Sequence, residues 1–235
     1  MSGDESFPDL RWQLGLEGES RYTCTMPTSD DKHNLLILPQ LRDRLCNYRP
    51  SPARVDAAVL IPVTDTAAPE LILTKRASHM SSHAGEVAFP GGKRESSDMS
   101  VIATALRESR EEIGLAEDRV DVIGEMDTFT SRVGLSVQPI VGMVPGDVPL
   151  IANPSEIESI FRVPVDFFLN EKPSYTHKFR FMGREIIVPS FNYGDYVIWG
   201  LTAFMIVDLM KRAYDHEIDF KWPSSIILPP NAAKH

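Results

Sequence analysis

Apolar residues along this chain cluster in short runs from residue 55 onward, and their spacing predicts strands rather than long helices. The runs are aliphatic and are bounded by turn residues, such as the DTAAP linker at 65–69. The predicted strands lie at 55–63, at 70–76, at 86–92, on either side of Val133-Gly134, and in a hairpin centred on Gly183.

Two segments have a helical period instead. The first runs from about Ser97 to Ile113, with Asp98 in or near its first turn and Gly114 as a good C-cap. Its predicted buried stripe, from which the glutamates are excluded, contains Val101, Ile102, Ala105, Leu106, Ser109 and Ile113. The second helix is predicted at 201–216. Short strands mixed with these helices indicate an α/β fold.

The chain divides into three predicted parts. Residues 1–50 form an N-terminal extension that is polar at first, carries a short helical pattern in HNLLILPQLRDRLCNY, and ends near two prolines, Pro50 and Pro52. Residues 51–217 form the main domain, and residues 218–235 form a C-terminal tail.

Composition narrows the class of protein. A hydrophobic content of 43% and a charged content of 24% are typical of a soluble globular protein, and the net charge of −9 argues against a nucleic-acid surface. The two cysteines, Cys24 and Cys46, provide neither a disulfide framework nor a metal cluster. No signal peptide or membrane-spanning run is predicted, so we expect a cytoplasmic protein without nucleic-acid or membrane partners.

Three glutamates, Glu108, Glu111 and Glu112, crowd the carbonyl end of the first helix. Like charges three or four residues apart cost about 0.2–0.5 kcal/mol in isolated helices, and the helix dipole disfavours carboxylates at this end. Clustered carboxylate oxygens suit hard divalent cations such as Mg²⁺ or Mn²⁺. We therefore interpret the acidic helix as a metal site, and the alternative is a solvated charged face.

The run Arg107-Glu108-Ser109-Arg110-Glu111-Glu112-Ile113-Gly114-Leu115 resembles the core of the Nudix box, G-x5-E-x7-R-E-U-x-E-E-x-G-U, where U is aliphatic. The residues that correspond to the first half of the Nudix box depart from this pattern, because the expected Glu falls on Met99 and the expected Gly on Lys93. One extra residue restores the match by pairing Gly92 with Asp98. Ser109 also stands where an aliphatic residue is usual.

The preceding residues narrow the resemblance to the coenzyme A pyrophosphatase branch of the Nudix family. That branch carries L-L-T-x-R-[S/A]-x3-R-x3-G-x3-F-P-G-G, and this chain has ILTKRA at 72–77, Gly85, and FPGG at 89–92. Ser81 occupies the place of the second arginine. The resemblance extends over about residues 53–215.

This resemblance implies a Nudix-type α/β/α sandwich with a mixed sheet and a loop-helix-loop catalytic motif. It implies hydrolysis of coenzyme A to 3′,5′-ADP and 4′-phosphopantetheine, with Mg²⁺ or Mn²⁺ as the cofactor. Glu108 and Glu112 are then the expected metal ligands, and Glu111 is a third ligand or the general base. Arg107 is expected to orient a glutamate through an ion pair, with a surface ion pair as the alternative.

Residues outside the helix carry further expectations. Arg76 is expected to hold a phosphate, with a solvated arginine at the end of a strand as the alternative. His83 is expected to be a loop histidine near the substrate. Glu156 is either a distal catalytic acid or the first residue of a helix. Gly91 and Gly92 are expected to shape the main chain at the substrate. Phe89 and Trp199 are interpreted as core residues, and His79 with His83 as too few for a zinc site.

Three questions stay open on sequence grounds. The resemblance implies a small nucleoside diphosphate derivative as the substrate, with coenzyme A first and ADP-ribose or another nucleoside diphosphate derivative as the alternative. The loss of arginine at Ser81 predicts a weakened preference for coenzyme A over its dephospho form. A non-catalytic nucleotide-sensing module is a further alternative, although such modules usually lose a helix glutamate. Both a monomer and a homodimer are compatible with the sequence.

Overall fold

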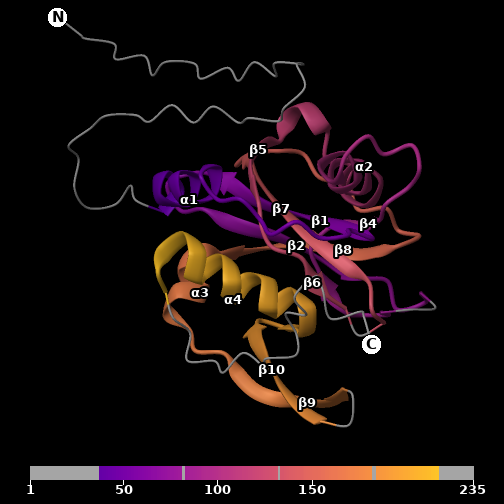
Figure 1. Cartoon of the computed structure of the whole chain (residues 1–235), viewed down its shortest axis with the longest axis vertical. Helices are drawn as coiled ribbons and strands as arrows, with labels where there is room; N and C mark the ends of the chain where they lie inside the picture. The colour runs from indigo at the N-terminus through magenta and orange to yellow at the C-terminus, as the bar shows by residue number, and fades with distance from the viewer. Residues whose placement is uncertain (1–36, 81–82, 132, 182–183, 217–235) are drawn as a thin grey trace, which may run out of the picture.

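The computed structural model describes residues 37–80, 83–131, 133–181 and 184–216, and Figure 1 shows their arrangement. Ser81 and Gly183, on which two expectations rest, lie outside these residues, as do most of the extension and the tail. Within the described ranges, none of the helices combines the length and the apolar character needed to cross a membrane.

A mixed sheet forms the centre of the fold. Its main path runs in the order β3 (Val87–Ala88), β2 (Glu70–Arg76), β1 (Ala57–Asp65), β7 (Ser136–Pro145) and β5 (Asp121–Glu125). β1 pairs in parallel with β7 along its whole length, and the other neighbours are antiparallel. Three further strands extend this sheet: β4 (Gly91–Lys93) on β1, β6 (Phe129–Thr130) on β7, and β8 (Ile157–Pro164) on β2.

Helices cover both faces of this sheet, because its central strands are apolar on both sides. Ala58 and Leu60 of β1 pack with the helix α2 (Val101–Ile113), whereas Ile61 and Val63 pack with α4 (Gly200–Tyr214) on the opposite face. Figure 1 shows α2 on one side of the sheet and α4 with α1 (Ile37–Cys46) on the other. The expected α/β/α sandwich is confirmed.

A second, three-stranded antiparallel sheet precedes the closing helix. It contains β9 (Ser174–Phe181), β10 (Arg184–Tyr193) and β11 (Tyr196–Trp199), and the short helix α3 (Val165–Asn170) leads into it. The strands of the predicted hairpin are therefore present.

Several predicted elements differ in detail. The predicted strand at 86–92 is two short strands, β3 and β4, because β3 pairs with β2 whereas β4 pairs with β1. Strand β8 and the 3₁₀ turn at Glu117–Arg119 were not predicted. Glu156 immediately precedes strand β8, so the alternative that it begins a helix is wrong.

Candidate active site

The helix α2 begins later than the sequence predicts, and its first turn explains why. Ser100 is the N-cap, and its side chain accepts a hydrogen bond from the amide of Ala103. Asp98 therefore lies before the helix rather than in its first turn. At the other end, Gly114 adopts the left-handed conformation with φ 67° and its amide bonds to the last turn, which confirms the predicted C-cap.

Glu112 is buried in the wall between α2 and the sheet, which corrects the expectation that the glutamates avoid the buried stripe. Its side chain is 4% exposed. One carboxylate oxygen accepts a hydrogen bond from Arg76 Nη1 at 3.1 Å, and the other accepts one from the amide of Gly91 at 3.0 Å. Burial nevertheless raises the pKa of Glu112 to about 7, and the nearby charge of Glu108 adds to this shift. Such a carboxylate is poised to bind a cation.

Arg107 connects helix α2 to the loop that precedes it. Its Nε and Nη2 donate to the two carboxylate oxygens of Asp98 at 2.9 and 3.1 Å, and Nη2 also donates to the carbonyl of Lys93 at 3.0 Å. Asp98 is 4% exposed and also accepts hydrogen bonds from Thr104 and from the amide of Glu95. The charge-assisted bonds to Arg107 hold the pKa of Asp98 well below its usual range.

The same arginine contacts two of the three helix glutamates. Nη1 of Arg107 lies 3.0 Å from Glu111, and Nη2 lies 3.1 Å from Glu108. The side chain of Arg107 is only 15% exposed, but its pair with Glu111, which is 50% exposed, is a helix ion pair at the surface, so both expectations for Arg107 stay open. Because each of the three glutamates has a positively charged or amide partner, the acidic patch is less repulsive than the sequence alone indicates.

The pair Glu108 and Glu112 suits a divalent cation. Both face the short strand β4: Glu112 bonds to the amide of Gly91, and a Cβ built on Gly92 would lie 2.4 Å from Glu108 Oε1. Burial raises the pKa of Glu108 as well. Among the described residues, no three His, Cys, Asp or Glu side chains converge as a complete metal cage. Mg²⁺ commonly takes only one or two carboxylates and completes its shell with water and substrate phosphates, so the residues fit this ion.

Arg76 and Glu156 lie beside this pair. Arg76 ends β2, is 19% exposed, and places its Nη2 3.9 Å from Glu156 Oε2 in addition to its bond with Glu112. The carbonyl of Glu156 accepts a hydrogen bond from the amide of Ala77, and His79 bonds to the adjacent carbonyl of Ser155. Arg76 therefore connects a buried carboxylate with a half-exposed one.

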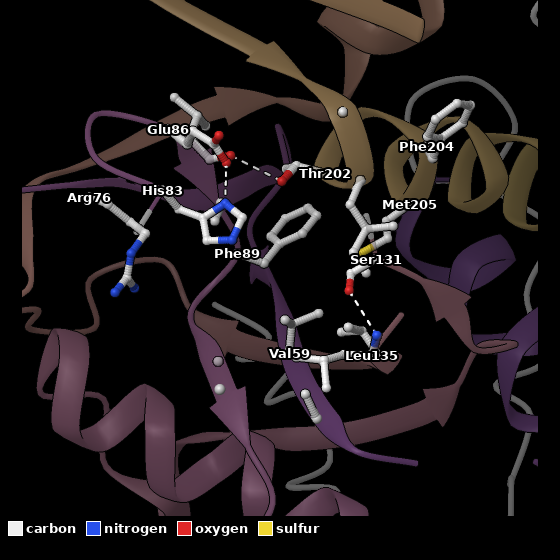
Figure 2. Close-up of a pocket in the computed structure, with 18 of the residues that line it drawn as sticks. Val59, Arg76, His83, Glu86, Phe89, Ser131, Leu135, Thr202, Phe204 and Met205 are labelled. Atoms are coloured by element: carbon white, nitrogen blue, oxygen red, sulfur yellow. Dashed lines mark hydrogen bonds and ion pairs between the residues drawn. The ribbon is translucent and has the colours of Figure 1, made fainter. Parts of the chain in front are cut away.

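A cavity of about 310 Å³ opens from this charged end into the molecule. Arg76, Glu112, Gly91 and Gly92 line its charged end, and Figure 2 shows Arg76, His83 and Glu86 on one side of it. Figure 2 shows Leu135, Phe204 and Met205 across the cavity from Arg76, together with the hydroxyl of Ser131. We call the apolar part of the lining the apolar arm, and it includes Phe89, Leu135, Val137, Leu201, Phe204 and Met205. Acidic, basic and apolar groups thus share one cavity.

The two aromatic residues that the sequence suggested for the core have a second role. Phe89 is 3% exposed and belongs to the main core cluster, and Trp199 is partly buried, yet both line the cavity. Of the two cysteines, Cys46 is buried and its thiol donates to the carbonyl of Asp43 at 3.5 Å, and Cys24 lies outside the described residues.

Sequence reasoning assigned no chemical role to two acidic residues of this region. Asp98 was identifiable only by allowing one extra residue in the loop before the helix, which pairs it with Gly92. Glu86 belongs to no motif that the sequence shows. Its contact with His83 depends on the conformation of the loop between β2 and β3. Ser109, which departs from the aliphatic pattern, is fully buried and donates to the carbonyl of Ala105 at 2.7 Å.

Comparison with known proteins shows what this chain is similar to. The sequence model of the NUDIX domain matches residues 54–184. An uncharacterized Nudix hydrolase, NudL, from Photorhabdus laumondii is 40% identical over 156 residues, which cover 66% of this chain and 83% of that protein. NudL of Yersinia pestis is also 40% identical and is covered to 78%. A solved MutT/nudix family protein from Enterococcus faecalis aligns with a TM-score of 0.44 and 16% identity, over 73% of this chain and 68% of that chain.

Proposed function

Because this chain belongs to the Nudix hydrolase family, we propose that it cleaves the diphosphate of coenzyme A or its derivatives to 3′,5′-ADP and 4′-phosphopantetheine. The supporting observation is the two-part cavity, in which the charged end with Arg76 and Glu112 adjoins the apolar arm. Coenzyme A has the same division, because its diphosphate continues into a pantetheine chain with apolar methyl and methylene groups.

Two of the hydroxyl groups around the cavity, those of Thr74 and Thr202, favour an apolar chain over a second sugar. Thr74 donates its hydroxyl to the carbonyl of Ala88, and Thr202 donates its hydroxyl to the carbonyl of Val87, both at 3.0 Å. These donors are therefore committed to the protein. A polar ribose, as in ADP-ribose, would receive no hydrogen bond from these two donors, so its hydroxyl partners in the lining would be limited to Thr130 and Ser131. Moving the pantetheine chain into the apolar arm costs less desolvation free energy, because much of that chain is apolar.

Glu108 and Glu112 are the proposed ligands of Mg²⁺ or Mn²⁺, with Glu111 as a third ligand or the general base. When bound, such a cation neutralises charge on the diphosphate and lowers the pKa of a water molecule. Gly92 allows the main chain to approach the carboxylate of Glu108 closely, because a Cβ there would overlap that carboxylate, and Gly91 allows β4 to lie close to the main chain of Ala58.

Arg107 is proposed to orient the glutamates, since it contacts Glu108 and Glu111 while Asp98 fixes its guanidinium plane. Glu111, which is half-exposed and paired with Arg107, is the first candidate for the general base. Glu156, which is 41% exposed beside Arg76, is the second candidate base. Arg76 is proposed to contact a substrate phosphate from the charged end of the cavity.

A substrate panel tests this proposal. Coenzyme A, an acyl-coenzyme A, dephospho-coenzyme A, ADP-ribose, NADH and dinucleoside polyphosphates are incubated with the enzyme and Mg²⁺, and products are identified by mass. We expect coenzyme A or its acyl form to give the highest kcat/KM. Cleavage of ADP-ribose without cleavage of any coenzyme A compound would contradict the substrate assignment and leave the family assignment intact.

A further inference from the structure

A histidine and a glutamate face each other at the edge of the cavity, outside the acidic helix. His83 Nδ1 lies 2.7 Å from Glu86 Oε2, and both residues line the cavity with Arg76 and Glu112 (Figure 2). Within the described part of the chain, the other ring nitrogen of His83, Nε2, has no hydrogen-bond partner. The pair therefore presents one uncommitted ring nitrogen beside the charged end.

The main chain fixes this pair to the strand that ends in Arg76. The amide of Arg76 donates to the carbonyl of Glu86 at 3.0 Å, and the amide of Gly85 donates back to the carbonyl of Arg76 at 3.2 Å. The amide of Glu86 in turn donates to the carbonyl of His83 at 3.1 Å, which closes a turn. Any shift of Glu86 would thus be transmitted to the main chain of Arg76.

His83 itself has a backbone conformation that side-chain-bearing residues seldom adopt. Its φ is 56°, and the other described non-glycine residue with positive φ, Asp215, is the C-cap of α4. Residues held in the left-handed region are concentrated at functional sites, where the surrounding contacts maintain them. Here the contact is the Glu86 carboxylate.

The charges around the cavity bear on what His83 can bind. Arg76 is already paired with Glu112 and lies near Glu156, so carboxylates offset much of its charge. A carboxylate that bonds one ring nitrogen of a histidine fixes the ring orientation and the tautomer, and leaves the second nitrogen to bind a ligand. With Nδ1–H donated to Glu86, Nε2 carries a proton only in the imidazolium form, which a carboxylate on one side of the ring and an anionic phosphate oxygen on the other both favour.

We propose that Glu86 is a positioning residue that holds His83 with Nε2 toward the cavity, where His83 hydrogen-bonds a phosphate oxygen of the substrate. This inference rests on the proposed diphosphate hydrolysis and assigns Glu86 a function in it. Glu86 acts through His83, so removing either residue weakens substrate binding by the same route.

The test compares Glu86→Ala, Glu86→Gln, His83→Asn and the double variant Glu86→Ala/His83→Asn. Asparagine tolerates the left-handed region, so His83→Asn removes the ring without forcing the backbone to change. Glutamine retains an oxygen that accepts the Nδ1 proton. Glu158→Ala is the matched control, because Glu158 is a half-exposed carboxylate paired with Lys75 and lies outside the cavity lining.

We measure KM and kcat for coenzyme A with Mg²⁺, together with melting temperature. Glu86→Ala and His83→Asn should each raise KM about tenfold, the size expected for one charge-assisted hydrogen bond. Their kcat should change less, and the double variant should be no worse than either single variant, because the two residues act as a unit. Glu86→Gln should stay within about threefold of wild type, and Glu158→Ala should be unchanged.

Three results would overturn the inference: an unchanged KM in His83→Asn, additive effects in the double variant, or equal damage from Glu86→Gln and Glu86→Ala. If coenzyme A is not cleaved at all, calorimetry with inorganic pyrophosphate and Mg²⁺ replaces the kinetics. Weaker pyrophosphate binding in His83→Asn and Glu86→Ala would then support the pair although the proposed substrate is wrong. Unchanged pyrophosphate binding would overturn it.

Discussion

Arg107 and Asp98 form a two-point ion pair across the start of the acidic helix, with N–O distances of 2.9 and 3.1 Å. The pair is nearly excluded from solvent, because the side chains are 15% and 4% exposed. Since the same guanidinium also contacts Glu108 and Glu111, the position of these carboxylates depends on a residue that lies outside the helix.

Asp98→Asn should therefore destabilise the protein by about 2–4 kcal/mol at pH 7, because Arg107 loses its buried charged partner. The pKa of Asp98 is lower in the folded state than in the unfolded chain, so this stabilisation is complete above the unfolded pKa of about 3.9. It is lost as the pH falls toward the folded value. Urea unfolding of wild type and variant from pH 7 to pH 3 should show the difference shrinking below about pH 4.

Asp121→Asn is the control for this experiment. Asp121 pairs with Arg42 but its side chain is 30% exposed, so its removal should cost less than about 1 kcal/mol. Equal losses in the two variants would show that burial of the Asp98 pair adds nothing.

Glu112→Gln should lower kcat/KM by about a hundredfold or more while preserving the fold, because it removes a proposed metal ligand. The matched control is Glu117→Gln, since Glu117 is half-exposed and pairs only with Arg110 among its described ion-pair partners. Kinetics are measured at limiting Mg²⁺, and circular dichroism checks the fold. Full turnover of wild type after metal stripping and in excess EDTA would contradict the metal site.

Stability of the metal-free protein should fall as the pH rises from about 4.5 to about 7, through Glu112. The pKa of this carboxyl is raised in the folded state to about 7, so the folded protein binds the proton more tightly than the unfolded chain does. The resulting stabilisation is complete at low pH and is lost through this interval. Glu112→Gln should show a smaller loss.

Millimolar Mg²⁺ should reverse this trend, because a cation competes with the proton for the same carboxylates and binds the folded state alone. Melting temperatures from pH 5 to pH 8, with EDTA or with Mg²⁺, measure both effects. A gain from Mg²⁺ that is equally large at pH 5 and pH 8 would contradict the involvement of Glu112.

Leu135→Ser should raise KM for coenzyme A several-fold without changing inhibition by the product 3′,5′-ADP, if the apolar arm holds the pantetheine chain. Leu135 is only partly buried, so the fold should tolerate the change. Ile151→Ser is the control, because Ile151 is an apolar residue that is 76% exposed and lies outside the cavity. Weaker inhibition by 3′,5′-ADP in Leu135→Ser would place the nucleotide half in the arm instead.

Local signals in the sequence were sufficient for much of the fold. The aliphatic run at 70–76 coincides with β2, and Gly114 ends α2 as predicted. Strand β8 escaped prediction because its residues between Ile157 and Val163 are only partly buried and lack clear alternation. Its position is set by pairing with β2, which is a tertiary contact.

The site was predictable only where its residues share one helix. The spacing of Glu108, Glu111 and Glu112 identified the acidic face, but it could not show that Glu112 turns inward toward Arg76. That contact joins residues 36 positions apart, and the one between His83 and Glu86 depends on an unusual φ. Neither of these two contacts produces a periodic pattern in the sequence.

The apolar arm draws part of its wall from residues beyond the region that matches the NUDIX domain. Leu201, Phe204 and Met205 come from α4, whereas the carboxylates come from α2, within residues 54–184. Substitutions at these three positions leave the helix that holds the glutamates untouched. A library confined to them could therefore change which chain is accepted beside the diphosphate while the hydrolytic residues stay constant, so the start of the closing helix is the natural place to redirect this enzyme.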